Sequence, residues 1–181
     1  LVSGVYISND QNGEVKLAPT VASEFNGSAL PTGWFTAQYP STGSGGTAFV
    51  SGGLLTLNGT RVGPDALLGS GHSLEFVANF SGAPYQHIGF GVDYFSGPWA
   101  IFSTDQTGNI FQARTNNSST STPNETSTIL SSSLLGTTHR FRIEWRSDQV
   151  LYFIDDTQVA SHAVTISQSM RPMAADYQAD G

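Results

Sequence analysis

Short runs of alternating apolar and polar residues are the feature that most constrains the fold of this chain. They recur at intervals of about 8 to 15 residues, between clusters of Gly, Pro, Asn and Ser. No apolar pattern with helical spacing continues beyond about one turn. This rhythm is typical of an antiparallel β-sandwich. We predict strands at residues 3–8, 47–50, 53–58, 73–80, 86–94, 98–104, 109–114, 139–146, 149–154 and 157–164.

The stretch HRFRIEWRSDQVLYFIDDTQVASH, residues 139–162, is dense in charged and aromatic side chains. Its first strand places Phe141, Ile143 and Trp145 on one face and charged residues on the other. The pair DD at 155–156 stands where a two-residue turn usually has Asp-Gly or Asn-Gly. Asp156 then needs a positive φ, which costs roughly 1 kcal/mol relative to Gly. We interpret the stretch as a structural hairpin whose charges lie on the surface.

Composition narrows the range of functions. The 181 residues suit one domain, and only 12% of them are charged. The net charge of −7 leaves no basic stripe, which argues against nucleic acid and anionic membranes as partners. Cysteine is absent, so disulfides and thiolate metal sites are excluded. No apolar run approaches the roughly 20 residues that span a bilayer. The polar, uncharged surface favours an extracellular or cell-surface protein.

Two segments interrupt the strand pattern. STGSGG at 41–46 is a glycine-rich loop, and residues 115–133 are mostly Ser and Thr. We expect the second segment to be a long exposed loop, either simply mobile or a glycosylated or ligand-covering flap. Six Asn-x-Ser/Thr sequons offer glycosylation sites if the source glycosylates Asn. They begin at Asn26, Asn58, Asn79, Asn116, Asn117 and Asn124.

Several of these stretches resemble one family. The hairpin at 139–162, EFNGSALPTGW at 24–34, HIGFGVDY at 87–94 and WAIFST at 99–104 are similar to concanavalin A-like (laminin G-like) lectin/glucanase domains of the bacterial extracellular type. The resemblance implies an all-β jelly roll, an antiparallel β-sandwich. We expect an N-terminal strand or extension over residues 1–21 and the sandwich over residues 22–181.

The sequence departs from the family pattern twice. Asp156 replaces the Gly of the Asp-Gly turn, and the chain ends at YQADG, where one more apolar strand is expected. We therefore expect a sandwich that lacks its last strand. Either the N-terminal VSGVYIS or a strand from another molecule would fill the open edge.

The resemblance also implies that ligands bind on the concave face of the sandwich. In residues 86–94, alternation places His87, Gly89, Gly91 and Asp93 opposite an apolar face made by Ile88, Phe90, Val92 and Tyr94. The first face has no side chains at its centre, so a ligand or second chain can approach the backbone. A flat Trp among polar groups suits a sugar, although half-buried packing explains it equally well. Our candidate carbohydrate site comprises Glu75, His87, Asp93, Trp99 and Arg114.

Catalytic patterns of this fold are missing. None of the five Glu begins a Glu-x-Asp-x-Glu or Glu-x-Asp-x-x-Glu pattern, which excludes the paired-carboxylate hydrolases of the laminarinase type. YQHIGF at 85–90 only superficially resembles the Gln-Ile-His strand of lyases. The His spacing does not suit zinc. By resemblance, one structural calcium ion is expected near the chain ends, with the weakly supported ligands Asp10, Glu24, Asp176 and Asp180.

These observations give three hypotheses for function. The first is a non-catalytic, lectin-like module that binds a glycan or polysaccharide, with no catalytic residues and no required cofactor. The second is a structural or adhesive building block that assembles with neighbouring copies, or other domains of a longer chain, by strand addition. The third is a polysaccharide lyase. The first is our prediction, and whether the chain is an enzyme stays open at this point.

Overall fold

The structure is a computed structural model that describes residues 5–7, 15–39, 46–118 and 124–177. The chain divides into two compact units. One contains Leu1–Thr32 and Phe49–Thr56, and the other contains Gly33–Ala48 and Leu57–Gly181. The described residues contain no helix long and apolar enough to cross a membrane.

Two small antiparallel sheets lie outside the sandwich. Strand β1 (Val5–Ile7) pairs with β2 (Val15–Leu17). Strand β4 (Thr47–Ser51) forms a second two-stranded sheet with β5 (Leu54–Asn58). Gly52 and Gly53 join β4 to β5 with φ angles of 60° and 81°, which a two-residue hairpin turn requires and Gly adopts without strain.

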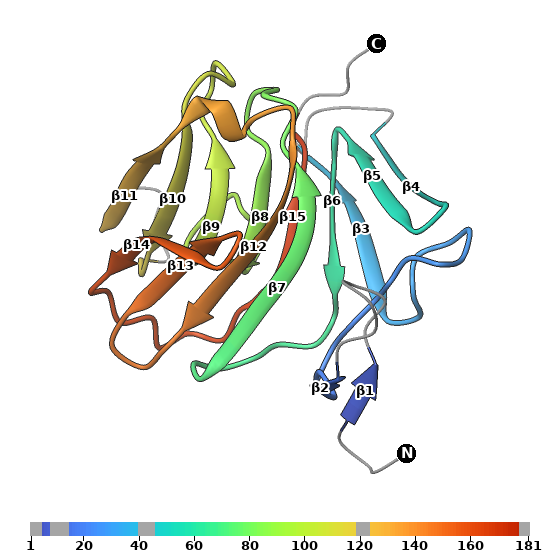
Figure 1. Cartoon of the computed structure of the whole chain (residues 1–181), viewed down its shortest axis with the longest axis horizontal. Coiled ribbons are helices and arrows are strands. Elements are labelled where there is room, and N and C mark those ends of the chain that lie inside the picture. The colour runs from blue at the N-terminus through green and yellow to red at the C-terminus, as the bar shows by residue number, and fades with distance from the viewer. Residues whose placement is uncertain (1–4, 8–14, 40–45, 119–123, 178–181) are drawn as a thin grey trace. The chain divides into compact units, whose positions relative to one another are not determined.

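The second unit is an antiparallel β-sandwich, which confirms the predicted fold class. A seven-stranded sheet has the order β11-β10-β9-β8-β15-β6-β3, and a four-stranded sheet has the order β14-β13-β12-β7. Figure 1 shows the four-stranded sheet in front of the larger one. The bounds are β3 Trp34–Gln38, β6 Thr60–Pro64, β7 His72–Asn79, β8 His87–Gly91, β9 Trp99–Thr104, β10 Phe111–Asn116, β11 Glu125–Leu130, β12 Thr138–Trp145, β13 Val150–Ile154, β14 Thr157–His162 and β15 Arg171–Ala175, with the short 3-10 helix η1 Ser132–Leu134.

The hydrophobic core lies between the two sheets. Alternation in β12 buries Phe141, Ile143 and Trp145 to 1% exposure or less, as the sequence predicted. From the larger sheet, Phe102 and Phe111 are buried completely and pack against Phe141. Because successive side chains of a strand face opposite sides, the intervening residues of the larger sheet point away from this core. We call that side the outer face.

The hairpin turn also agrees with the prediction. Asp155 and Asp156 have φ angles of 48° and 66°, and β13 and β14 pair directly on either side of them. Asp155 gains compensating contacts, since its carboxylate accepts hydrogen bonds from the backbone N–H of Arg140 and from the His139 ring. The stretch is a structural hairpin in the four-stranded sheet.

Strands β2, β3, β6, β11 and β15 were not among the predicted ones. The prediction of a long loop over residues 115–133 is wrong for residues 115–116, which end β10, and for residues 125–130, which form β11 and pair with β10 along its full length. The β-branched residues of ETSTIL suit an edge strand. Most side chains of this segment are polar, so it lacks the alternation of apolar and polar residues from which the strands were predicted. Strand β15 lies between β8 and β6, in the interior of the seven-stranded sheet. Residues 41–45 of the predicted glycine-rich loop lie outside the described residues.

Candidate functional site

A pocket opens on the outer face of the seven-stranded sheet. It is lined by Tyr39, Tyr85, His87, Tyr94, Trp99, Ile101 and Arg114. Three neighbouring strands supply its floor: His87 from β8, Trp99 and Ile101 from β9, and Arg114 from β10. The register pairs Ile101 with Arg114, so the two side chains share one face of the sheet. We refer to these seven residues as the pocket.

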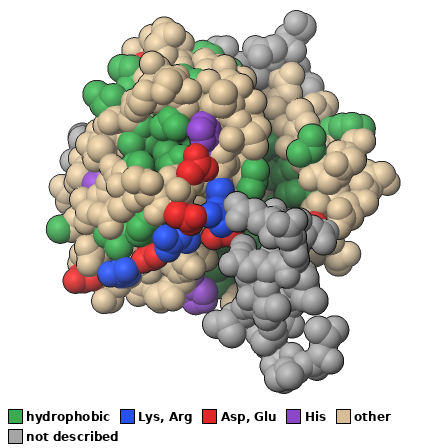
Figure 2. Space-filling model, in the orientation of Figure 1, with side chains coloured by type: hydrophobic (Ala, Val, Ile, Leu, Met, Phe, Trp, Pro, Cys, Tyr) green, Lys and Arg blue, Asp and Glu red, His purple; other side chains and the backbone are tan. Residues whose placement is uncertain are grey.

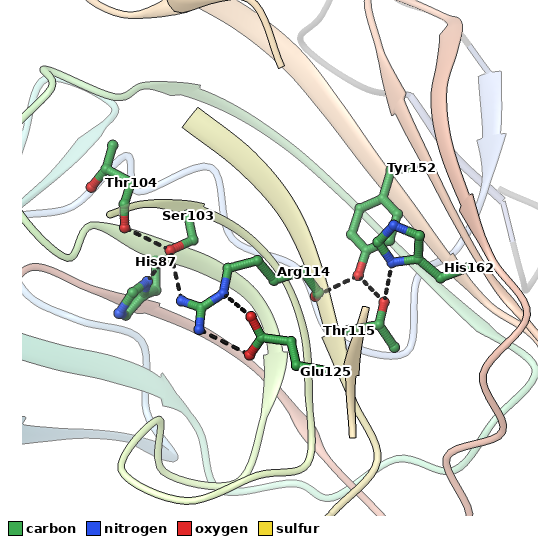
Figure 3. A network of polar contacts seen from close by, with 8 residues as sticks. All are labelled: His87, Ser103, Thr104, Arg114, Thr115, Glu125, Tyr152 and His162. Carbon is green, nitrogen blue, oxygen red and sulfur yellow. Dashed lines mark hydrogen bonds and ion pairs between the residues drawn. The ribbon is translucent and has the colours of Figure 1, made fainter. Parts of the chain in front are cut away.

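His87 is held in one orientation by Ser103 of the adjacent strand (Figure 3). Its Nδ1 lies 2.8 Å from the Ser103 hydroxyl oxygen, and that hydroxyl donates to the carbonyl oxygen of Thr104 at 2.8 Å. Since the Ser103 proton is already used, Nδ1 carries a proton and donates it to Ser103. The ring nitrogen Nε2 is then an acceptor, and none of the described residues hydrogen-bonds to it.

Burial keeps His87 neutral. The side chain is 4% exposed, and its removal from water, with the Arg114 cation close by, lowers the pKa of His87 from 6.5 to about 3. The imidazole is therefore uncharged over the physiological pH range. It presents to the pocket a nitrogen lone pair that can accept a hydrogen bond or a proton.

Arg114 forms the charged wall of the pocket. Its Nε and Nη2 donate to the two carboxylate oxygens of Glu125 at 2.7 and 2.9 Å, a bidentate pair between β10 and the edge strand β11. Its Nη1 lies 3.4 Å from the Ser103 hydroxyl, and its guanidinium carbon lies 5.5 Å from the centroid of the Trp99 ring. Figure 3 shows Ser103 between His87 and Arg114. Glu125 therefore orients Arg114 against both the indole and the His87 network.

Tyr94 fills a space that the sequence analysis had assigned to a ligand. Strand β8 ends at Gly91, and Tyr94 follows with a φ of 63°, which breaks the strand alternation. A Cβ atom on Gly91 would lie 2.3 Å from Cε1 of Tyr94, so the ring packs directly over this Gly. Its hydroxyl donates to the carbonyl oxygen of Met173 at 2.7 Å. The prediction that this strand face is open is wrong here, and Tyr94 does not share the face of Ile88 and Phe90 as predicted.

Tyr39 was also missed, because it lies in a segment that carried no strand signal. It is 5% exposed, and its hydroxyl donates to the Tyr94 carbonyl oxygen at 3.2 Å. Burial raises its pKa well above the ordinary value of a tyrosine. Its ring centroid lies 5.9 Å from that of His87 and 5.0 Å from that of Tyr177. An aromatic wall therefore surrounds the neutral imidazole.

The structure brings together three of the five predicted carbohydrate-site residues, His87, Trp99 and Arg114. Glu75 lies on β7 of the four-stranded sheet, paired in register with Arg142, and does not belong to the site. Asp93 lies just beyond β8, where its Oδ1 accepts from the backbone N–H groups of Phe95 and Ser96 at 2.9 and 3.0 Å. Its carboxylate shapes the turn and does not line the pocket.

The structure describes two of the four predicted calcium ligands, Glu24 and Asp176. Asp10 and Asp180 lie outside the described residues, and Glu24 and Asp176 belong to different units. Asp176 accepts a hydrogen bond from Gln86 Nε2 at 3.0 Å. Within the described ranges, no group of three His, Asp or Glu side chains could hold a metal ion. A calcium site stays a prediction from the sequence.

The asparagines of the six predicted glycosylation sequons differ in their exposure to solvent. Asn26, Asn79, Asn117 and Asn124 are exposed and Asn58 is half-buried. Asn116 is 1% exposed, and its side-chain oxygen accepts from the backbone N–H of Ser118 at 2.8 Å. In this fold Asn116 is inaccessible to a glycosylating enzyme.

A second polar network joins the two sheets behind the pocket and is structural. Tyr152 of β13 donates to the Arg114 carbonyl oxygen at 2.7 Å and lies 2.6 Å from the Thr115 hydroxyl. His162 of β14 lies 2.8 Å from that hydroxyl and 3.0 Å from the hydroxyl of Thr128. Figure 3 shows that Tyr152, Thr115 and His162 lie beyond the Arg114 backbone, away from its guanidinium. They fix β10 against the smaller sheet.

The comparisons with known proteins show the fold. No model of a protein family and no curated protein matches this sequence. Among solved structures, a glycosyl hydrolase family protein from Mycobacterium fortuitum is 15% identical with a TM-score of 0.61, over 91% of this chain and 92% of that one. A β-1,3-1,4-glucanase (lichenase) from a mouse hindgut metagenome is 14% identical with a TM-score of 0.59, over 88% and 86%. β-Agarase A from Zobellia galactanivorans is 11% identical with a TM-score of 0.61, over 85% and 77%.

These likenesses confirm the concanavalin A-like sandwich and correct the predicted function. The similar structures are those of a glycosyl hydrolase, a glucanase and an agarase, all of them enzymes. The prediction of a non-catalytic, lectin-like module is overturned by this comparison. At such low identity the likeness extends to the fold, and the chemistry has to be argued from the pocket.

Proposed function

We propose that this chain is a carbohydrate-active enzyme that binds a polysaccharide on the outer face of its seven-stranded sheet and cleaves it at the pocket. The observation that carries the proposal is His87, a neutral, buried imidazole whose Nε2 faces the pocket without a partner among the described residues. An acceptor nitrogen held at the wall of an open pocket can take a hydrogen bond from a ligand that supplies the donor, such as a sugar hydroxyl.

The walls of the pocket suit a sugar ring. Trp99 offers a flat apolar surface, and the hydroxyl groups of Tyr39 and Tyr85 add polar edges to aromatic walls. Sugars present apolar C–H faces and polar hydroxyl edges, so stacking on the indole and hydrogen bonds to the surrounding groups are satisfied together. The similar structures include enzymes named for glucan and agarose substrates, which also supports a polysaccharide.

The residues favour proton transfer by His87 over a pair of carboxylates. Neither Glu125 nor Asp93 points freely into the pocket, because Glu125 is bound by Nε and Nη2 of Arg114 and Asp93 caps a turn. His87 has its Nδ1–H anchored on Ser103, which leaves Nε2 to accept a proton from the substrate. Because its pKa is about 3, His87 is a weak base, and the transfer depends on stabilisation of the charge that the substrate develops. Arg114 is placed to stabilise negative charge that develops on the substrate beside it.

We also propose that the chain acts outside the cell. A polymeric glycan substrate and a surface with few charged residues both favour that location.

The proposal is tested by assaying the purified chain for new reducing ends on a panel of neutral and acidic polysaccharides. Wild-type protein should release oligosaccharides from at least one of them, and His87→Ala should reduce the rate by about 100-fold or more, as expected for a lost proton-transfer group. His72→Gln is the matched control, since His72 lies on β7 of the other sheet and its ring contacts a neighbouring loop carbonyl, that of Gly69. Equal rates for wild type and His87→Ala would contradict the proposal.

A further inference from the structure

Arginine pairing differs between the four-stranded sheet and strands β6 and β15 of the larger sheet. On the four-stranded sheet, Arg140 pairs with Asp156, and Arg142 and Arg146 both pair with Glu144. Figure 2 shows these charges as a row of alternating blue and red across the visible face. In a chain with 14 acidic and 7 basic residues, an arginine readily finds a carboxylate. An arginine that lacks a carboxylate partner is therefore unusual in this chain and calls for an explanation.

Arg61, on β6, is such a residue. Its Nη1 donates to the backbone carbonyl oxygen of Asp93 at 2.6 Å, and its guanidinium carbon lies 4.6 Å from the centroid of the Phe95 ring. No described carboxylate lies within 4.0 Å of it. Its Nε is buried and has no hydrogen-bond partner among the described residues. Arg61 is thus a half-buried cation, held in place by a ring and a neutral carbonyl.

Arg171, on the adjacent strand β15, repeats the arrangement. Its guanidinium carbon lies 5.4 Å from the centroid of the Phe35 ring, and its Nε is also buried without a partner in the described part of the chain. Its Nη1 approaches the Pro64 carbonyl oxygen at 3.4 Å and the exposed carboxylate of Asp65 at 3.9 Å, which is a weak ion pair. Burial lowers the pKa of Arg61, the nearby Asp93 carboxylate offsets part of this, and Arg171 lowers the pKa again because the two cations repel each other.

Both arginines lie on the same face of the sheet as the pocket. Ala174 pairs with Val62, which is completely buried in the core, so Arg61 and Arg171 occupy the alternate, outer positions of their strands. Strand β6 is two strands away from β8, a distance of about 10 Å. A polysaccharide that crosses the strands from His87 would therefore reach Arg61.

We propose that Arg61 and Arg171 form a subsite for a negatively charged substituent, so that the substrate is an anionic polysaccharide bearing carboxylate or sulfate groups. This inference rests on the proposed function, since it places the same bound chain across the same face. A carboxylate or sulfate accepts hydrogen bonds from both planar groups. It supplies the directly bonded counter-charge that Arg61 lacks among the described residues and that Arg171 has only in its weak pair with Asp65. It also reduces the repulsion between the two cations.

The test compares each charged glycan with its uncharged counterpart. Binding to the full chain is measured by calorimetry with oligogalacturonate and its methyl ester, and with carrageenan and agarose oligosaccharides. Wild type should bind the charged member of one pair about tenfold or more tightly, and the pair that responds identifies carboxylate or sulfate. Arg61→Gln should remove about tenfold of affinity for the charged ligand, the usual value of a charged hydrogen bond, and leave the neutral one unchanged.

Arg142→Gln is the matched control, since Arg142 also stacks on a ring, that of Phe153 at 3.9 Å, but is paired with Glu144. It should bind like wild type. Arg171→Gln is the second variant and should reproduce the loss if Arg61→Gln does not fold. Equal binding of charged and neutral partners would overturn the anionic subsite and leave the proposed function standing. Absence of binding to all four ligands, together with inactivity on the polysaccharide panel, would overturn both.

Discussion

Nδ1 of His87 lies 2.8 Å from the hydroxyl oxygen of Ser103, its register partner across β8 and β9. This one contact determines which ring nitrogen carries the proton and which nitrogen faces the pocket. Ser103 is completely buried, and its hydroxyl oxygen also accepts a hydrogen bond from Nη1 of Arg114 at 3.4 Å. The orientation of the imidazole and that of the charged wall are therefore fixed by the same hydroxyl.

Replacement of Ser103 by Ala should leave the His87 ring without an anchor. We expect a loss of about 1–3 kcal/mol in stability, because a buried ring N–H loses its acceptor, and a larger fractional loss in kcat than in KM. Ser103→Thr keeps the hydroxyl and should restore part of the rate. Thermal denaturation and steady-state kinetics on the best substrate measure the two effects. Unchanged kinetics in Ser103→Ala would rule out this positioning role.

Truncation of Trp99 to Ala should weaken glycan binding by about tenfold, since an aromatic stacking contact is worth roughly 0.5–1.5 kcal/mol beyond its buried area. The fold should persist, because Trp99 lies on the outer face and not among the core rings between the sheets. Calorimetric titration with an oligosaccharide is the measurement. Glu75→Gln, on the other sheet, serves as the control and should not alter affinity.

Acid should destabilise the folded chain through His87. The pKa of His87 is about 3 when folded and near 6.5 when unfolded, so between these values the unfolded chain binds a proton that the folded chain does not. Stability is fully present above pH 6.5 and falls as the pH is lowered, by up to about 1.4 kcal/mol per pH unit. Burial lowers the pKa of His162 as well, which acts in the same direction.

Urea denaturation at several pH values between 7 and 4 measures this slope. His87→Gln should show a smaller dependence on pH than wild type, whatever its stability at pH 7. A slope that is identical in the two proteins would mean that His87 titrates normally and is not buried as described.

A methyl group at position 91 should displace Tyr94. The added Cβ of Gly91→Ala would lie 2.3 Å from the ring of Tyr94, whose hydroxyl also bonds β15. We expect a loss of about 1–3 kcal/mol, typical of overpacking, together with weaker glycan binding. Gly69→Ala is the matched control, because no described atom lies within 4 Å of the position that its methyl group would take. Comparable stability of the two variants would show that Tyr94 does not need the space above Gly91.

The pair between Arg114 and Glu125 should couple the edge strand to the pocket. A double-mutant cycle with Arg114→Gln and Glu125→Gln should give an interaction energy of about 1 kcal/mol, the upper range for exposed pairs, since both side chains are about one-fifth exposed. High salt should reduce it only slightly. A coupling energy near zero would mean that Glu125 does not hold Arg114.

The alternation of apolar and polar residues along the sequence predicted the sandwich and part of the pocket. Alternation placed Phe141, Ile143 and Trp145 together on one face of their strand, because a strand's side chains alternate whatever the neighbouring strand is. It could not tell which sheet a strand joins, so Glu75 was grouped with residues of the other sheet. The polar strand β11 lacks an apolar stripe, so the sequence did not indicate that it pairs with β10. It therefore also did not indicate that Glu125 of β11 binds Arg114 of β10.

The position of Tyr94 in the pocket could not be predicted from alternation along the strand. Tyr94 follows a strand in sequence, and continued alternation would place it in the core. A positive φ beyond Gly91 instead folds its ring back over the outer face. Such a reversal depends on contacts with β15, almost 80 residues away, and no local signal in the sequence reports it.

The most direct measurement is mass spectrometry of the products after polysaccharides are incubated with wild-type protein and with His87→Ala. The account predicts oligosaccharides from at least one polysaccharide with wild type and almost none with the variant. The product mass then distinguishes cleavage by water from cleavage by elimination. If wild-type protein binds a polysaccharide at the pocket and leaves it intact, the proposal of an enzyme is contradicted.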